Sequence, residues 1–98
     1  MAYSKKKITL STSNKEDTKA EFDKFNGYII DIICNLIDRG VSATRELAKV
    51  IGTSTIKVYI NSHNRSVDVK YNVNKKVNIS KTFTTKEDVK EEFSKLIL

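Results

Sequence analysis

The spacing of apolar residues changes once along this chain of 98 residues, and this change constrains the fold more than any other feature. In the first half, apolar residues recur at intervals of three and four, which is the period of one helical face. These residues are Phe22, Phe25, Ile29, Ile32, Ile33, Leu36 and Ile37. From Val67 onward the interval is two, the period of a strand with one buried face. A short chain with both periods is expected to form a small single α+β domain.

The apolar stripe predicts a helix over about residues 16–39. Asn14 is a residue type that caps a first helical turn, and Arg39 followed by Gly40 is a typical stop signal. The single cysteine, Cys34, lies in the apolar region of this helix, where we expect a buried and unreactive thiol. An internal disulfide is excluded because there is no second cysteine.

Two further helices are expected on either side of the strand region. The first covers about residues 43–51, contains Leu47, Val50 and Ile51, and ends at Gly52. Thr84 and Glu87 form a capping box that begins a last helix at about residues 86–97. The sequence therefore predicts two N-terminal helices and one C-terminal helix.

Strand periodicity is clearest between these helices. Apolar residues at 67, 69, 71 and 73 alternate with polar ones, and the same alternation returns at 77, 79 and 83. A turn at Asn74 and Lys75 would join the two runs into an antiparallel hairpin with one apolar and one polar face.

Residues 54–62 fit two structures equally well. Ile56, Val58 and Ile60 alternate with polar residues and are β-branched, which favours a strand. Ile56, Tyr59 and Ile60 also have helical spacing, and periodicity does not separate the two over so short a segment. As a strand, the segment completes a three-stranded meander of 54–61, 66–73 and 76–84; as a helix, it leaves a two-stranded hairpin.

Charge is sorted along the sequence. Residues 49–86 contain eight cations and only Asp68 as an acid, and residues 1–15 contain four lysines and no acid. Acids outnumber cations in 16–48 and in 87–98, and the net charge is +6. Basic stretches of this kind attract a polyanion, because each neutralised phosphate releases counterions. We therefore expect a nucleic-acid partner, provided that these cations share one water-facing side.

If residues 54–62 are helical, the segment 41–62 resembles a helix-turn-helix. Leu47, Ala48, Ile51, Gly52, Ser54 and Val58 have the spacing of that motif, and the basic hairpin would be a wing. Over about residues 20–83 the chain is then similar to winged helix-turn-helix DNA-binding proteins.

That resemblance implies a small protein of a phage or mobile element that binds duplex DNA, and a homodimer, because groove readers commonly dimerise. It places base contacts at Ser54, Thr55, Lys57 and Asn61, and phosphate contacts at Arg65, Lys70, Lys75 and Lys76. Lys5, Lys6 and Lys7 would follow a groove.

If residues 54–62 form a strand, another surface becomes available. Lys57, Tyr59, Lys70, Asn72 and Asn78 would share the polar face of the meander. An exposed tyrosine beside lysines can stack a nucleobase, as in sheet-based proteins that bind single strands. The competing interpretation is a strand tyrosine that merely tolerates solvent.

A further resemblance is to anti-CRISPR proteins, small chains of phages and mobile elements. The Lys-rich start and the helices packed on a small antiparallel sheet are similar to some of them. The resemblance implies an inhibitor that binds an RNA-guided nuclease complex stoichiometrically. Many members are acidic mimics of nucleic acid, whereas this chain is basic, so it would contact guide RNA or an acidic protein face.

Residue types needed for catalysis are scarce. His63 is the single histidine and is not placed to cooperate with Cys34. A zinc site cannot be assembled from one cysteine and one histidine. The three glycines are far apart, which excludes a phosphate-binding loop. We therefore expect no enzymatic activity, no cofactor and no metal.

Membrane and export signals are also missing from the sequence. The start lacks the apolar stretch of a secretory signal, and no apolar run is long enough to span a bilayer. We expect a cytoplasmic protein with no membrane partner, in which residues 1–15 are a flexible basic arm and 16–98 form the domain.

Overall fold

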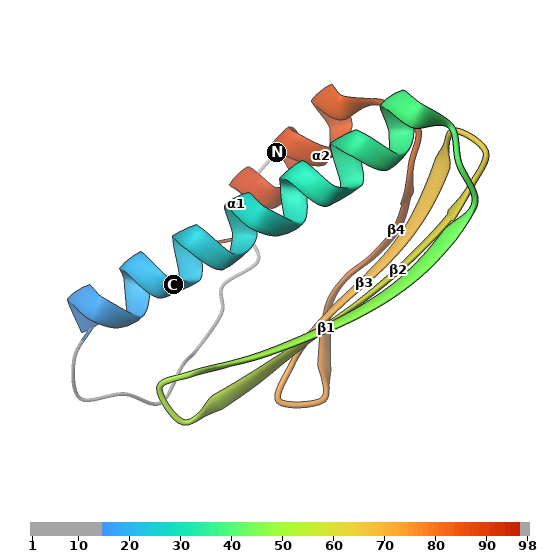
Figure 1. Ribbon diagram of the computed structural model, residues 1–98. Coiled ribbons are helices and arrows are strands. Elements are labelled where there is room, and N and C mark those ends of the chain that lie inside the picture. The colour runs from blue at the N-terminus through green and yellow to red at the C-terminus, as the bar shows by residue number, and fades with distance from the viewer. Residues whose placement is uncertain (1–14, 97–98) are drawn as a thin grey trace, which may run out of the picture.

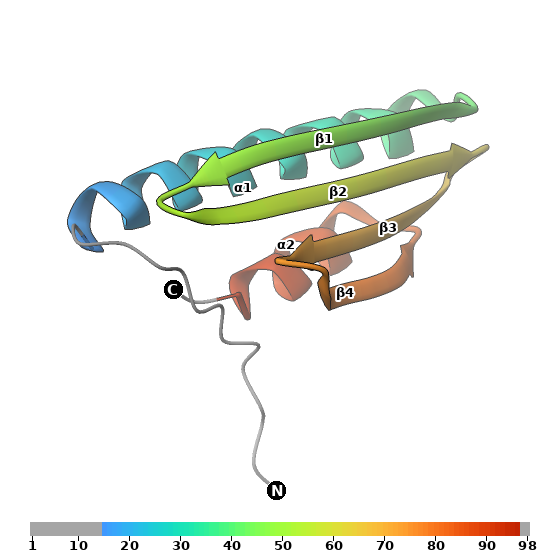
Figure 2. The same cartoon turned by 90° about the horizontal axis from the view of Figure 1, so that it is seen from below.

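A four-stranded antiparallel sheet lies between one long and one short helix in chain order. The computed structural model describes residues 15–96. The elements are α1 (Lys15–Arg39), β1 (Ala43–Ile51), β2 (Ser54–His63), β3 (Ser66–Val73), β4 (Lys76–Phe83) and α2 (Lys86–Ser94). The strands follow one another in the order β1-β2-β3-β4 (Figure 2), so each pairs with its neighbour in the sequence. The fold class is α+β as expected, but its details differ from the prediction.

Residues 43–51 form an edge strand, so the predicted second N-terminal helix is wrong. All nine residues pair with β2, from Ala43 opposite Ser62 to Ile51 opposite Ser54. Gly52 does not end a helix; it lies in the turn between β1 and β2, with a φ of 64°. Glycine adopts this left-handed backbone without the steric penalty of a Cβ atom.

Residues 54–63 form strand β2, which settles the segment that fitted both structures. The recognition helix of a helix-turn-helix is therefore excluded, and with it the winged-helix architecture. The sheet has four strands, which is two more than the predicted hairpin and one more than the three-stranded meander. The β-branched residues at 56, 58 and 60 are fully buried, and their packing between two neighbouring strands decides the conformation.

Both helices cover the same face of the sheet (Figure 1). In Figure 2, α1 runs behind β1 and β2, and α2 lies behind β3 and β4. The core is made of apolar side chains from the inner faces of these elements: Phe22, Ile29, Ile33, Ile56, Val58, Ile60, Val67, Val69, Tyr71, Ile79, Phe83 and Val89 are all at most 2% exposed. The ring of Phe93 on α2 packs edge-on against Tyr71 at 5.8 Å between centroids.

The ends of the helices are close to their expected places. Helix α1 ends at Arg39, and the backbone N–H of Gly40 donates to Leu36 O at 2.9 Å. Helix α2 is capped by Thr85, whose Oγ1 accepts from the backbone N–H of Asp88 at 3.1 Å, one residue later than the predicted capping box. Helix α2 ends at Ser94 rather than at 97.

Candidate nucleic-acid interface

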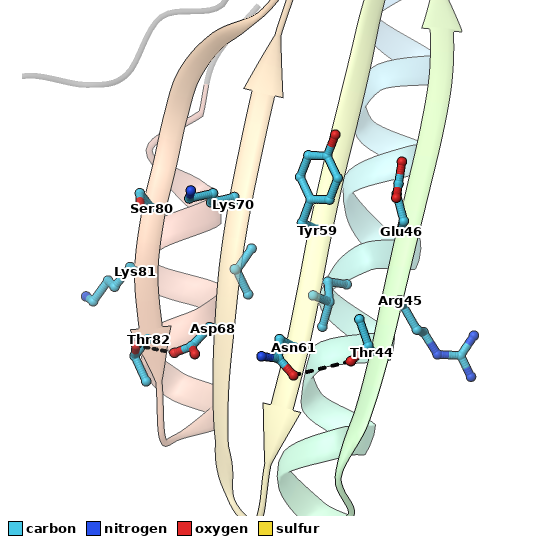
Figure 3. Close-up of a pocket in the computed structure, with 12 residues that line it drawn as sticks. Thr44, Arg45, Glu46, Tyr59, Asn61, Asp68, Lys70, Ser80, Lys81 and Thr82 are labelled. Atoms are coloured by element: carbon cyan, nitrogen blue, oxygen red, sulfur yellow. Dashed lines mark hydrogen bonds between the residues drawn. The ribbon is translucent and has the colours of Figure 1, made fainter.

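The face of the sheet opposite the helices is open to solvent in the part of the chain that the structure describes. Figure 3 looks onto this face, with both helices behind the strands. Strand β2 contributes its odd-numbered residues to it, because the even-numbered ones from 54 to 62 are buried against the helices. We call this surface the open face.

Register places the open-face residues in rows that cross the strands, because directly opposed residues of antiparallel strands point to the same side. The central row is Glu46, Tyr59, Lys70 and Ser80. On one side of it lies the row Ala48, Lys57, Asn72 and Val77, and on the other the row Thr44, Asn61, Asp68 and Thr82. Lys57, Tyr59, Lys70 and Asn72 therefore share the polar face as predicted. The register shift between Tyr71 and Asn72 leaves Asn78 out of these rows and places Val77, predicted on the apolar face, on the open face instead. Strand β1 adds a carboxylate, Glu46.

Tyr59 divides the open face into two hollows. Its side chain is 38% exposed, enough for a ring to be reached by a ligand. One hollow, of about 530 Å³, has Glu46, Asp68 and Lys70 among its lining residues (Figure 3). The other, of about 550 Å³, is lined by Thr55, Lys57, Tyr59, Asn72, Asn74 and Lys75. We call the second the acid-free hollow, because no carboxylate lines it.

Asn74 holds the acid-free hollow in shape. It lies in the two-residue turn between β3 and β4 with Lys75, and φ is positive at both residues, 51° and 70°. Such a turn matches the twist of the strands it joins. The Oδ1 of Asn74 accepts from the backbone N–H of Thr55 at 3.0 Å, and its backbone N–H donates to Thr55 O at 2.9 Å. These bonds fix one hairpin end against the other.

Hydrogen bonds also order the other side of the open face, where the first hollow is lined by both carboxylates and lysines. Thr82 donates its hydroxyl to Oδ1 of Asp68, and Thr44 donates to Oδ1 of Asn61 at 3.4 Å. Both bonds join neighbouring strands, as Figure 3 shows. On the acid-free side, Oδ1 of Asn72 is buried and accepts no hydrogen bond from the described residues.

The cations of residues 49–86 do not all share one side, contrary to the condition set for polyanion binding. Three of the eight, Lys57, Lys70 and Lys75, lie on or beside the open face. Lys81 also lines the first hollow, but register places it opposite the inward-facing Val69. Lys49 and Lys76 are opposite the inward-facing Ile56 and Val73, so register places them on the helix side. Carboxylates behind the sheet pair with the two other lysines, as Lys81–Glu92 at 3.8 Å and Lys86–Asp38 at 3.2 Å.

Arg65 serves the fold. Its Nη1 donates to the backbone carbonyls of Ile37 and Asp38, at 3.0 and 3.2 Å. These carbonyls are at the C-terminal end of α1, where a cation is favoured by the helix dipole. These bonds direct the guanidinium at the end of α1.

The structure thus brings together five of the predicted contact residues and separates the others. Thr55, Lys57, Asn61, Lys70 and Lys75 lie on or beside the open face. Ser54 is fully buried, and Arg65 and Lys76 lie elsewhere. Lys5, Lys6 and Lys7 and the rest of the predicted arm up to residue 14 lie outside the described residues.

Sequence reasoning missed Glu46 and Asn74 as parts of the site. The sequence pattern predicts a helix at Glu46, whereas its position opposite Tyr59 requires a strand that the pattern does not indicate. Asn74 was identified as a turn residue, but its bonds to the other hairpin end could be seen only in the folded chain.

Features of other kinds of site are sparse in residues 15–96. No group of three His, Cys, Asp or Glu side chains there is arranged to hold a metal ion. Burial raises the pKa of the partly buried Cys34, and the nearby Lys90 and Lys86 oppose this only in part. Neither described helix is both long and apolar enough to cross a membrane.

Comparisons with known proteins add no family. No protein-family model matches this sequence, and neither a curated protein nor a solved structure matches it.

Proposed function

We propose that this protein is a non-enzymatic module that binds single-stranded nucleic acid on the open face of its sheet. The observation that carries the proposal is the position of Tyr59, an exposed ring at the centre of the face, beside the acid-free hollow with Lys57 and Lys75. A base can stack on the ring while the lysines meet the phosphates on either side. Lys70, opposite Tyr59 on β3, adds a third cation.

Single strands suit this surface better than a duplex does. Stacking on Tyr59 requires an unpaired base with a free face, which a duplex interior does not offer. The predicted duplex readout depended on a recognition helix at residues 54–62, and these residues form β2. The proposal therefore keeps the nucleic-acid partner and replaces the mode of binding.

Binding is tested by fluorescence anisotropy with labelled single-stranded DNA and RNA of mixed sequence, about 10 nucleotides long, in line with the usual site sizes of sheet-based binders. We expect Y59A to weaken binding about 5- to 150-fold, the equivalent of about 1–3 kcal/mol for one lost base stack. Y28A is the matched control, because Tyr28 on α1 is even more exposed, at 55%, than Tyr59.

Salt dependence tests the cations separately. Each phosphate contact contributes about 0.7 to the slope of log affinity against log salt for a single strand. K57A and K70A should each lower this slope, whereas K24A and K90A, which change exposed lysines on α1 and α2, should not. Absence of binding at low salt, or equal effects of Y59A and Y28A, would overturn the proposal.

The alternative function, stoichiometric inhibition of an RNA-guided nuclease complex, stays a prediction without a particular side-chain arrangement in its favour. It is distinguished by the same variants. An inhibitor of this kind would block nuclease activity while binding free oligonucleotides weakly and independently of Tyr59.

A further inference from the structure

The central row of the open face places an acceptor and a cation on opposite sides of the Tyr59 ring. Glu46 is directly opposite Tyr59 on β1, and Lys70 is directly opposite it on β3. Opposed side chains on neighbouring strands have Cβ atoms about 5 Å apart, which is within the width of a nucleobase. A base stacked on Tyr59 therefore meets Glu46 along one edge.

The Glu46 carboxylate is available to a ligand. It is exposed, lies alongside the Tyr59 ring in Figure 3, and forms no ion pair or hydrogen bond with the residues the structure describes. Lys70 extends away from Glu46, toward Ser80. The row thus separates a hydrogen-bond acceptor on the β1 side from a phosphate-binding cation on the β3 side.

A carboxylate discriminates among the four bases because it only accepts hydrogen bonds. Guanine has two adjacent donors on its Watson–Crick edge, N1–H and the N2 amino group, which match the two oxygens of a carboxylate. Adenine and cytosine place a ring-nitrogen acceptor beside their amino donor, and thymine or uracil flanks its single donor with two carbonyls. In these three cases an acceptor faces the carboxylate and is repelled.

We infer that the open face selects a guanine, stacked on Tyr59 and hydrogen-bonded through its Watson–Crick edge to Glu46. This inference rests on the proposed binding of single strands and adds the base that is recognised. Bidentate pairs of this kind are charge-assisted and geometrically specific. They discriminate against a wrong base by about 1–3 kcal/mol, so we expect guanine to be preferred about 5- to 150-fold.

The test uses oligothymidylate of about 10 nucleotides, within the usual range of site sizes, in which one central base is varied. Guanine should bind most tightly. Inosine, which lacks the N2 amino group, should be intermediate, and adenine, cytosine and 2-aminopurine should bind like the unsubstituted oligonucleotide. Affinity is measured by anisotropy at one fixed salt concentration.

E46Q gives a signature that a general change in charge does not. Removing the carboxylate charge lessens repulsion of phosphates, so oligonucleotides without guanine should bind more tightly. The guanine oligonucleotide should bind more weakly, because one oxygen acceptor has become an amide donor. The matched control is E21Q, which removes an exposed carboxylate from α1 on the other side of the sheet.

The possible outcomes distinguish this inference from the proposed function on which it rests. Tyr59-dependent binding with no base preference, or a guanine preference that survives in E46Q, overturns the guanine reading and leaves single-strand binding intact. Failure of the wild-type protein to bind any single strand overturns both. A guanine preference that E46Q removes and E21Q retains supports the inference.

Discussion

Tyr71 on β3 donates its hydroxyl hydrogen to Oδ1 of Asn26 on α1 over 2.7 Å. Tyr71 is fully buried and Asn26 is 8% exposed, so the bond satisfies two polar groups inside the core. It is one of the points where the long helix is fixed against the sheet that presents the open face. A buried polar group without a hydrogen-bond partner costs free energy. Removing the polar group of either residue would therefore leave the other unpaired and destabilise this packing.

We expect N26A to lower the free energy of unfolding by about 1–3 kcal/mol, because it leaves the Tyr71 hydroxyl buried without an acceptor. Chemical denaturation monitored by circular dichroism measures the change. N35A is the control, since Asn35 is an exposed residue of the same helix. A loss in N35A equal to that in N26A would contradict the assigned role of the bond.

The same tyrosine predicts a loss of stability in alkali. Burial raises the pKa of Tyr71 in the folded state above its ordinary value, against a smaller lowering by the bond to Asn26. Its contribution is therefore complete below the unfolded-state pKa of about 10 and is lost as pH rises above that value. Above it, the free energy of unfolding should fall by about 1.4 kcal/mol per pH unit from this group.

Y71F isolates the contribution of the Tyr71 hydroxyl. Its free energy of unfolding should decline less steeply with pH than that of the wild type, measured by urea denaturation between about pH 9 and 11 around the ordinary tyrosine pKa. Parallel pH profiles of the two proteins would show that Tyr71 does not contribute.

The sequence predicted those parts of the fold whose apolar period is set by burial. Phe22, Ile29 and Ile33 are buried on α1, and Val67 and Val69 are buried on β3, as their spacing indicates. Helix α1 and the hairpin of β3 and β4 could be predicted for this reason. The apolar period of each segment predicts this burial without reference to the rest of the chain.

Strand β1 could not be predicted because it lies at the edge of the sheet. Its inward positions include Arg45 and Lys49, which are exposed to solvent and do not pack in the core. The apolar alternation of a strand is therefore absent. Val50 points outward and is 61% exposed, although its spacing from Leu47 suggested a helix. Tertiary pairing with β2 decided the conformation against the local pattern.

Charge density along the sequence did not predict the site for a similar reason. Arg65 and Lys70 are five residues apart, yet the first bonds to carbonyls of α1 and the second is on the open face. Only the turn lengths and the register decide which cation faces solvent with Tyr59. The sequence also does not distinguish Lys81 and Lys86, which pair with Glu92 and Asp38 behind the sheet, from the lysines of the open face.

Asn74 combines a strained backbone with side-chain bonds, and two variants separate them. N74G keeps the positive φ of 51° at little cost but loses the bond to the backbone N–H of Thr55. N74A loses this bond and must also hold a left-handed backbone. We expect N74A to be less stable than N74G by about 1 kcal/mol, and both to be less stable than the wild type. Thermal unfolding of the three proteins checks this order, and a more stable N74A would contradict it.

Arg65 gives the clearest separation of folding from binding among the cations. R65A removes the donor to the Ile37 and Asp38 carbonyls and should lower the free energy of unfolding by about 0.5–1.5 kcal/mol. Because the guanidinium is directed at α1 and away from the open face, the salt slope of oligonucleotide binding should stay unchanged, while K70A lowers it. Denaturation and salt titration of both variants make the comparison. A lower salt slope in R65A with unchanged stability would return Arg65 to the phosphate contacts predicted from the sequence.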